Sequence, residues 1–502
     1  MFLEGLQLAI TWTNLLFMLI GCLLGIIFSA IPALTFGTAM IILIPLTFSL
    51  EPLPAISVLL GVFAGGMTGG SISSVLLGIP GTPSAAATVL DGYVMAKKGK
   101  AGQALGMSIY SSVFGGLFSL LVLMFVAPQV AKVALQLGTP EIFAIVLFGL
   151  STIVGLTQGS KVKGLISGVL GLMLCTIGLD PIMGLQRYTF GFTGLMAGVG
   201  VMPVMIGMFA LPEVVEHLLQ ARRERFLAKP KLKTKVEAKF PSLKEQKESF
   251  WLNLKSSALG TAIGSIPGGG GPIASFLAYD MAKRKNPLVG TGHIDGVIAP
   301  EAANNGVCGG AMIPLLTLGI PSDSVTAILL GALLIHGVVP GPLLFRDNGP
   351  LVYSIFISIV VINIMVLVVQ FFGMKLFVKV LDIPKTNLML MIFSLTIVGS
   401  FAQNLNFSDI VIMLIAGFIG YLMKKFGFPV TPLILGLVLG STLEDNFRKS
   451  LVYSRGSLMI FLTSPVCLVF FALTILMFLS PTLKRLWAER KAKRAAARAT
   501  NA

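Results

Sequence analysis

Long apolar stretches dominate the chain, and short polar breaks separate them. A helix needs about 20 mostly apolar residues to cross a bilayer. The stretches are continuous rather than alternating, which favours helices over barrel strands. We therefore predict an all-α polytopic membrane protein with roughly 11 to 13 transmembrane segments, some of them broken or re-entrant. The candidate segments are 12–31, 34–50, 55–77, 83–95, 104–128, 141–158, 162–179, 190–211, 256–280, 306–318, 322–337, 351–372, 387–402, 408–423, 428–442 and 456–480.

One long polar stretch, residues 213–255, divides this apolar pattern into two parts of similar length. Such a division calls for a search for internal repeats. The organisation that we predict is a first membrane repeat at 1–212, a basic cytoplasmic linker at 213–255, a second membrane repeat at 256–483 and a basic cytoplasmic tail at 484–502.

Two breaks in the first part recur in the second. The segment GIIFSAIPA, which begins at Gly25, aligns with GTAIGSIPG, which begins at Gly260, at an offset of 235 residues. The Gly-Ile-Pro that begins at Gly78 aligns with the one that begins at Gly319, at an offset of 241 residues. Two shared breaks in the same order indicate a structural duplication.

The loops that follow the first break of each part differ in charge. Residues 48–54 contain no basic residue, whereas their counterpart contains Lys283, Arg284 and Lys285. Because basic residues favour cytoplasmic loops, the opposite charge bias favours inverted repeats. Inverted repeats with broken helices are a recurring design of secondary transporters, which bind substrate at the repeat interface.

The Gly-Ile-Pro breaks predict two re-entrant hairpins. Thr82 is a good helix N-cap and Pro83 a good first helical residue, and Ser322 or Asp323 can cap in the same way. The arms around the second break, 306–318 and 322–336, are short enough for re-entrant segments. We therefore expect each break to be a hairpin tip. The alternative is that glycine and proline only kink tightly packed helices, as the spacing of Gly61, Gly65 and Gly69 suggests.

Two hairpin tips that face each other would form an anion site. A helix N-terminus exposes unpaired N–H groups and a partial positive charge, which suits carboxylate or phosphate groups. Carbonyl groups at the unwound turns could hold a sodium ion. The substrate-binding candidates are Gly78, Pro80, Gly81, Thr82, Ser84, Gly319, Pro321, Ser322, Asp323, Ser324, Asn304 and Asn305.

The stretch 299–310 places Glu301, Asn304 and Asn305 on adjacent helical turns before the second tip. These side chains could bind the substrate, bind a cation or hydrogen-bond neighbouring helices together. Carboxylates inside a membrane are costly and usually functional. The candidate residues for the coupling ion, Na⁺ or H⁺, are Glu301, Asp323, Pro32, Pro267 and Gly268.

Composition agrees with a membrane protein, since 55% of the residues are hydrophobic and 12% are charged. The net charge of +16 is concentrated in Arg222–Lys255, with eleven basic residues, and in Lys484–Arg498, with seven. Both segments are expected in the cytoplasm, close to anionic headgroups of the lipid bilayer. No aromatic residues interleave with the basic ones as a stacking platform, so no nucleic-acid partner is expected.

Enzymatic chemistry finds little support in the sequence. The four cysteines, Cys22, Cys175, Cys308 and Cys467, are isolated, so we expect neither a metal site nor disulfides. Nucleophile, zinc and P-loop motifs are missing from the sequence, so we expect no catalytic residues and no cofactor. A membrane-embedded enzyme, a lipid-handling protein and a passive anion channel remain the alternatives to a transporter.

Two longer stretches carry a family resemblance. GIPGTPSAAATVLDGYVMAKKGKAGQALG, at 78–106, and APEAANNGVCGGAMIPLLTLGIPSDSVTAILLGALLIHGVVPGPLLF, at 299–345, resemble the signature regions of the TctA family. These proteins are the large membrane subunits of bacterial tripartite tricarboxylate transporters. The resemblance implies an inner-membrane secondary transporter for citrate or related carboxylates. It also implies two partners, a small TctB-like membrane subunit and a periplasmic TctC-like solute-binding protein.

The second tip departs from this family pattern. The resemblance implies small neutral residues after Gly-Ile-Pro, often glycine and then serine, but Ser322 and Asp323 stand there. An aspartate at a helix start would neutralise the helix dipole and repel a substrate carboxylate. Asp323 therefore faces away as a cap, or helps to bind a cation, or serves a substrate with fewer carboxylates or a positive group. Val94, where the family commonly has proline, is expected to change only a turn.

Overall fold

The computed structural model describes residues 2–31, 34–151, 160–180, 183–224, 238–268, 270–380, 393–401 and 405–478. Pro32 and the tail at 484–502 lie outside these residues. The chain forms two compact units, Met1–Leu135 with Val199–Phe426 and Gln136–Gly198 with Gly427–Ala502. Each half of the chain thus contributes first to the larger unit and then to the smaller one. The repeat boundaries at 212 and 256 remain predictions.

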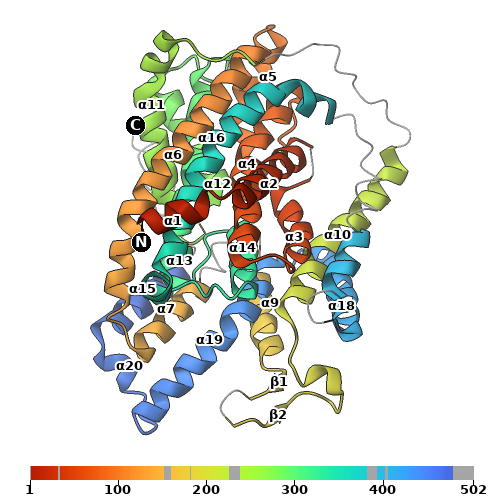
Figure 1. Ribbon diagram of the computed structural model, residues 1–502, viewed down its shortest axis with the longest axis vertical. Coiled ribbons are helices and arrows are strands. Elements are labelled where there is room, and N and C mark those ends of the chain that lie inside the picture. Colours follow the sequence, from red (N-terminus) through yellow and green to blue (C-terminus); the bar gives the residue numbers. More distant parts are fainter. Residues whose placement is uncertain are drawn as a thin grey trace, which may run out of the picture. The chain divides into compact units, whose positions relative to one another are not determined.

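The described residues are almost entirely helical, which confirms the predicted all-α class (Figure 1). The larger unit contains α1 (Phe2–Ala9), α2 (Trp12–Ala30), α3 (Phe36–Leu46), α4 (Pro52–Leu77), η1 (Pro83–Ala85), α5 (Ala86–Lys97), α6 (Ala101–Ala134), α10 (Val201–Glu224), α11 (Leu243–Gly264), α12 (Gly270–Lys285), α13 (Asp295–Leu318), α14 (Ser324–Ile335), α15 (Pro342–Asp347), α16 (Gly349–Val380) and α18 (Phe407–Lys425).

The smaller unit contains α7 (Thr139–Ser151), α9 (Lys161–Cys175), β1 (Gly178–Leu179), β2 (Gln186–Arg187), η2 (Thr193–Leu195), α19 (Thr431–Tyr453) and α20 (Ile460–Thr463). Its two-residue strands pair antiparallel and form the one sheet among the described residues. Buried Asp180 beside β1 accepts a hydrogen bond from Arg448 of α19 at 2.7 Å. Arg187 of β2 bonds Glu444 of α19 at 2.6 Å. These ion pairs attach the strand hairpin to α19.

Within the described part of the chain, five helices are long and apolar enough to cross a bilayer. They are α2, α4, α6, α16 and α18. Shorter apolar helices include α3, α7, α14 and Pro465–Phe478. The protein is therefore a multi-pass membrane protein, while the total of 11 to 13 segments stays a prediction.

Two helix pairs repeat the same contacts at the predicted offsets. A Cβ added to Gly25 of α2 would lie 2.4 Å from the carbonyl oxygen of Val62 on α4. A Cβ added to Gly260 of α11 would lie 2.1 Å from that of Ala303 on α13. The two glycines are 235 residues apart and the two carbonyls 241, as in the sequence alignment. Two further pairs of contacts match in the same way. Gly65 contacts Cys22 as Gly306 contacts Ser257, and Gly69 contacts Ile26 as Gly310 contacts Thr261.

Equivalent glycines end the two long helices. Gly78 after α4 has φ 67° and ψ 20°, and Gly319 after α13 has φ 69° and ψ 21°. This left-handed geometry suits glycine, which lacks a Cβ. The helices that follow each tip, α5 and α14, have 12 residues each, so the predicted short arm at 322–336 is confirmed.

Two predicted segments were wrong. The arm before the second tip does not begin near residue 306, because α13 runs without interruption from Asp295 for 24 residues. Its polar residues are buried against other helices and do not end it. The segment 190–211 forms an α-helix only from Val201, since the preceding residues form a loop with the short turn η2, in which Gly191 and Gly198 have positive φ.

Candidate functional site

The first tip, residues 78–85, lies against the end of α2 and the middle of α4. The Gly81 amide donates to the carbonyl of Gly70 at 3.4 Å. A Cβ on Gly81 would lie 2.1 Å from the carbonyl oxygen of Ser29. Pro80 is exposed and Ile79 is 49% exposed, so this turn reaches the surface. Close backbone packing on one side and an open surface on the other define the tip.

Thr82 occupies the N-cap position, as predicted, but its side chain makes no capping hydrogen bond. A single 3₁₀ turn, η1, begins at Pro83, and the α-helix follows only at Ala86. The Thr82 hydroxyl is buried and has no partner within the described residues. The capping residue is therefore present while its hydroxyl is not used for capping.

The break between α11 and α12, at residues 265–268, contacts the second tip, and the start of α12 after it contacts the first. A Cβ on Gly271, at the start of α12, would lie 2.4 Å from the Ser84 hydroxyl and 2.8 Å from the Asn304 side-chain oxygen. The Gly268 amide donates to the carbonyl of Ser322 at 2.9 Å. Pro267 beside it is buried. The start of α12 thus contacts the first tip, and the break before α12 contacts the second.

The other break shows the corresponding arrangement. A Cβ added to Gly37, at the start of α3, would lie 3.5 Å from the side chains of Val325 and Ile328 on α14. Each tip therefore packs against broken helices of both halves, whereas the sequence predicted that the two tips face each other directly. The site candidates come together through these crossed contacts.

Four buried polar atoms at the breaks have no hydrogen-bond partner among the described residues. They are Ser29 Oγ, Thr82 Oγ1, Asn304 Oδ1 and Ser322 Oγ. The amide nitrogen of Asn304 donates to the carbonyl of Met67 at 2.8 Å, which leaves its oxygen as the unpaired atom. A buried polar group without a partner costs about 1–3 kcal/mol. Unpaired groups of this kind are candidates for binding a polar ligand.

Asp323 acts as the N-cap of α14. Its Oδ1 accepts from the backbone amide of Thr326 at 2.8 Å. The Thr326 hydroxyl in turn accepts from the amides of Ser322 at 3.0 Å and Asp323 at 2.8 Å. The amides at this helix start are therefore paired within the turn and do not form the free anion site that the sequence predicted. Buried Pro321 precedes the turn, and Ser324 is the first residue of α14.

Glu301 lies on α13 and is 1% exposed. One carboxylate oxygen accepts from the Thr88 hydroxyl of α5 at 2.6 Å, and the other accepts from the Ser112 hydroxyl of α6 at 2.9 Å. Asn305 accepts from the Thr68 hydroxyl of α4 at 3.1 Å, which joins α13 to α4. Sequence reasoning missed Thr88 and Ser112, because isolated hydroxyl residues carry no motif.

Asp91 of α5 forms a second buried carboxylate site that sequence reasoning missed. Its side chain accepts from the Tyr279 hydroxyl at 2.9 Å and from the amides of Gly290 at 2.8 Å, Gly292 at 2.6 Å and His293 at 2.9 Å. Gly290 has φ 103° and Gly292 φ 89°, a backbone that lets successive amides converge. Asp91 thus anchors the loop between α12 and α13.

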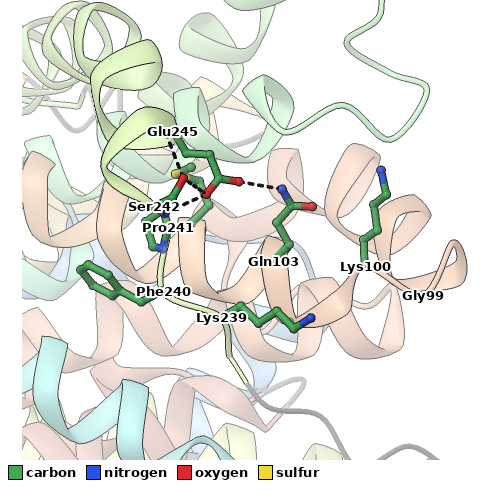
Figure 2. Close-up of a pocket in the computed structure, with 10 residues that line it drawn as sticks. Gly99, Lys100, Gln103, Lys239, Phe240, Pro241, Ser242 and Glu245 are labelled. Atoms are coloured by element: carbon green, nitrogen blue, oxygen red, sulfur yellow. Dashed lines mark hydrogen bonds between the residues drawn. The ribbon is translucent and has the colours of Figure 1, made fainter.

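A cavity of about 330 Å³ opens at the start of α6 (Figure 2). The loop before α6 and the end of the polar linker form its walls, with Lys100 and Lys239 on its rim. Glu245 of α11 accepts from the Ser242 amide at 2.8 Å and from the Gln103 side chain at 2.9 Å. These hydrogen bonds, first that of the Ser242 amide, hold the pKa of Glu245 below its ordinary value.

The linker end should therefore loosen in acid. Because its folded-state pKa is lowered, Glu245 stabilises the docked linker above the ordinary glutamate pKa. That stabilisation is lost as pH falls through the lowered value. Hydrogen exchange at 238–246, corrected for intrinsic rates, should rise in this range in the wild type, and Glu245→Gln should remove the pH dependence. Exposed Glu248→Gln is the control, and an unchanged profile in Glu245→Gln would contradict the assignment.

Broken helices that gather buried polar groups in a multi-pass helical protein are a recurring design of transporters. A family model, Tripartite tricarboxylate transporter TctA family, matches residues 15–435. The chain belongs to the TctA family and is a membrane subunit of the tripartite tricarboxylate transporter type. The family is one of transporters rather than enzymes.

Two relatives from Agrobacterium vitis are similar to this chain. One, described as "Uncharacterized 52.8 kDa protein in TAR-I ttuC' 3'region", is 35% identical over 465 residues, which are 92% of each chain. The other, described as "Uncharacterized protein in TAR-II ttuC' 3'region", is 37% identical over 210 residues, which are 41% of this chain and 87% of the relative. No solved structure matches the chain.

Proposed function

We propose that the protein is the permease subunit of an ion-coupled secondary transporter that takes up tricarboxylates such as citrate, or related organic carboxylates. The observation that carries this proposal is the group of four unpartnered buried polar atoms at the helix breaks. The coupling ion is Na⁺ or H⁺. The permease works in the bacterial inner membrane, with the linker and tail in the cytoplasm, beside a small membrane subunit and a periplasmic solute-binding protein.

The chemistry of these atoms suits a hydroxylated or multiply charged carboxylate. The hydroxyls of Ser29, Thr82 and Ser322 can donate to carboxylate oxygens. The N-terminus of α12, at Gly270, adds a partial positive charge near Ser84 and Asn304. Asn304 Oδ1 can accept from a substrate hydroxyl or coordinate a cation. Glycine at 271 keeps Ser84 and Asn304 close to this helix start.

Uptake by reconstituted vesicles tests the proposal. The permease and its two partner proteins would be offered labelled di- and tricarboxylates, with and without a Na⁺ or H⁺ gradient. Accumulation against the substrate gradient is expected. Flux that only follows the substrate gradient would indicate a channel, and altered lipid composition without uptake would indicate a lipid-handling protein. Absence of uptake for every carboxylate would overturn the proposal.

Removing the Thr82 hydroxyl should weaken substrate binding. Thr82→Val keeps the side-chain volume and deletes the unpartnered hydroxyl, so KM should rise about fivefold for the loss of one hydrogen bond worth about 1 kcal/mol. The control is Thr317→Val, since the Thr317 hydroxyl donates to the carbonyl of Ile313 in its own helix at 2.6 Å. Equal KM values for Thr82→Val and the wild type would remove this hydroxyl from the site.

Neutral substitutions of Asp323 distinguish its role as a helix cap from a role of its negative charge. Asparagine caps a helix about as well as aspartate, so Asp323→Asn should keep transport within about twofold if capping is the only role. Asp323→Ala removes the cap and should lower stability by about 0.5–2 kcal/mol. Initial uptake rates and thermal unfolding in detergent measure both effects. A large loss of uptake in Asp323→Asn with unchanged stability would assign the charge to cation binding.

A further inference from the structure

Buried polar residues on α6 and α11 lie along the chain between the level of Glu301 and the cavity at the start of α6. We call the residues Ser108, Ser111, Asn253 and Ser256 the α6–α11 polar face. Helices α6 and α11 pack against each other and against α13, with Phe114 and Phe250 in edge contact at 5.7 Å. The cavity end of this face is formed by Gln103 and Glu245, which share a hydrogen bond (Figure 2). The other end is Ser112, which bonds Glu301. From Gln103 to Ser112 the helix rises about 14 Å.

The residues between these ends contain unpartnered polar atoms. Ser108 Oγ and Ser111 Oγ on α6, both side-chain atoms of Asn253 on α11 and Ser256 Oγ have no hydrogen-bond partner within the described ranges. All four residues are fully buried. Buried polar groups in proteins almost always have a partner, and ordered water is the usual one where protein groups do not supply it. Ordered water would supply the missing partners of these four residues along α6 and α11.

We propose that Glu301 binds the coupling proton and that the α6–α11 polar face conducts it between Glu301 and the cavity. The proposal rests on the proposed transport function and specifies its coupling ion. In the loading step the carboxylate takes up one proton and becomes a carboxylic acid, whose O–H donates to the Thr88 or Ser112 hydroxyl. In the release step the same proton passes to this ordered water and leaves through the cavity, and no other reactant is consumed.

The surroundings of Glu301 favour a proton over a sodium ion. Both carboxylate oxygens already accept from hydroxyl groups, and α13 continues unbroken through this residue. A sodium site in such transporters uses carbonyls of unwound backbone, which this position lacks. The side chains of Thr88 and Ser112 can each accept as well as donate, so they pair with the carboxylate and with the carboxylic acid.

Other titratable groups near the path have separate partners or positions. The elements around α13 contribute Asp91 from α5, Tyr279 from α12 and Asp323 from α14, and Cys308 lies on α13 itself. Asp91 and Tyr279 bond each other, and Asp323 caps α14. The cavity end contributes Glu245, Lys100 and Lys239. Among the described residues no ion pair involves Glu301, so its proton is the one that the path can exchange.

Separating exchange from accumulation tests the proposal in vesicles that contain the full transporter. Exchange of labelled for unlabelled carboxylate needs substrate movement but no net proton flow. Glu301→Gln keeps the side-chain size, so exchange should stay within about twofold while accumulation driven by a pH gradient falls by about tenfold or more. The matched control is Glu213→Gln, because Glu213 also accepts from a threonine hydroxyl, that of Thr38 at 3.1 Å, but lies on α10.

A second pair of variants tests the path. Ser108→Ala combined with Ser111→Ala should slow uptake driven by a pH gradient about fivefold and leave exchange unchanged. Ser57→Ala on α4 is the control, since its hydroxyl is also buried and unpartnered. Infrared difference spectra of the purified protein during a pH change should show a carboxylic acid band that Glu301→Gln lacks. This readout is independent of transport.

Several outcomes would overturn the proposal. Wild-type accumulation on a sodium gradient without a pH gradient would do so and leave the proposed transport function intact. Retained accumulation in Glu301→Gln, or its loss in Glu213→Gln alone, would assign the coupling site elsewhere. An unchanged infrared band in Glu301→Gln would exclude this carboxyl group. A wild-type protein without any uptake would overturn the transport function together with the proposal.

Discussion

Replacing Gly81 with alanine is expected to abolish transport while the protein still inserts into the membrane. The added Cβ would lie 2.1 Å from the Ser29 carbonyl oxygen, 2.6 Å from the Ser73 hydroxyl and 2.8 Å from the Gly70 Cα. Two of these atoms belong to backbone, so the first tip itself must shift. Over-packing of this kind costs about 1–3 kcal/mol, and the shift displaces the neighbouring Thr82 hydroxyl from its place among the unpartnered atoms.

Gly37→Ala is the matched control for this prediction. It lies at the start of a broken helix against the other tip, but its added Cβ would meet neighbours only at the ordinary distance of 3.5 Å. Initial uptake rates should therefore be close to wild type in Gly37→Ala and absent in Gly81→Ala. Size-exclusion profiles show whether both variants are folded. Full transport in Gly81→Ala would place the substrate site away from this tip.

Replacing Asp91 with alanine is expected to be the most destabilising single change in the larger unit. The substitution leaves three partly buried backbone amides and the buried Tyr279 hydroxyl without their acceptor. Removing one partner from a buried charged network lowers the free energy of unfolding by about 3–5 kcal/mol. The loop between α12 and α13 should detach from α5, since these bonds are what hold it there.

Thermal unfolding of purified protein in detergent measures this effect. Tyr279→Phe is the graded control, because it removes one of the donors and should cost only about 1 kcal/mol. A larger loss of stability in Tyr279→Phe than in Asp91→Ala would show that the ring, rather than the carboxylate, holds the loop.

Local signals in the sequence predicted the breaks and the repeat. The Gly-Ile-Pro at Gly78 and Gly319 ends a helix wherever it stands, because glycine adopts the left-handed geometry and proline cannot continue the helix. The offsets of 235 and 241 residues followed from the alignment alone, and the packing of Gly25 and Gly260 reproduces them. Features that depend on a few neighbouring residues could therefore be predicted.

Features that depend on distant pairs could not be predicted. The partners of Glu301 lie 213 and 189 residues away, and neither Thr88 nor Ser112 belongs to a recognisable motif. The continuity of α13 was missed for the same reason. Its polar stretch resembles a helix end in sequence, but the side chains of Glu301 and Asn305 find buried partners on α4, α5 and α6. The sequence leaves three roles open for Asp323, and its bond to Thr326 depends on the local turn that the structure adds.

The interleaving of the two units has a consequence for how the protein is made. Residues 1–135 are synthesised long before 199–426, which complete the same unit. During that interval Thr88, Asp91 and Ser112 are in the nascent chain while Glu301, Tyr279 and the loop at 290–293 are still missing. The early helices are therefore in the membrane before their polar side chains have these hydrogen-bond partners. The polar side chains of the first half therefore gain these hydrogen bonds only once the second half of the chain is in the membrane.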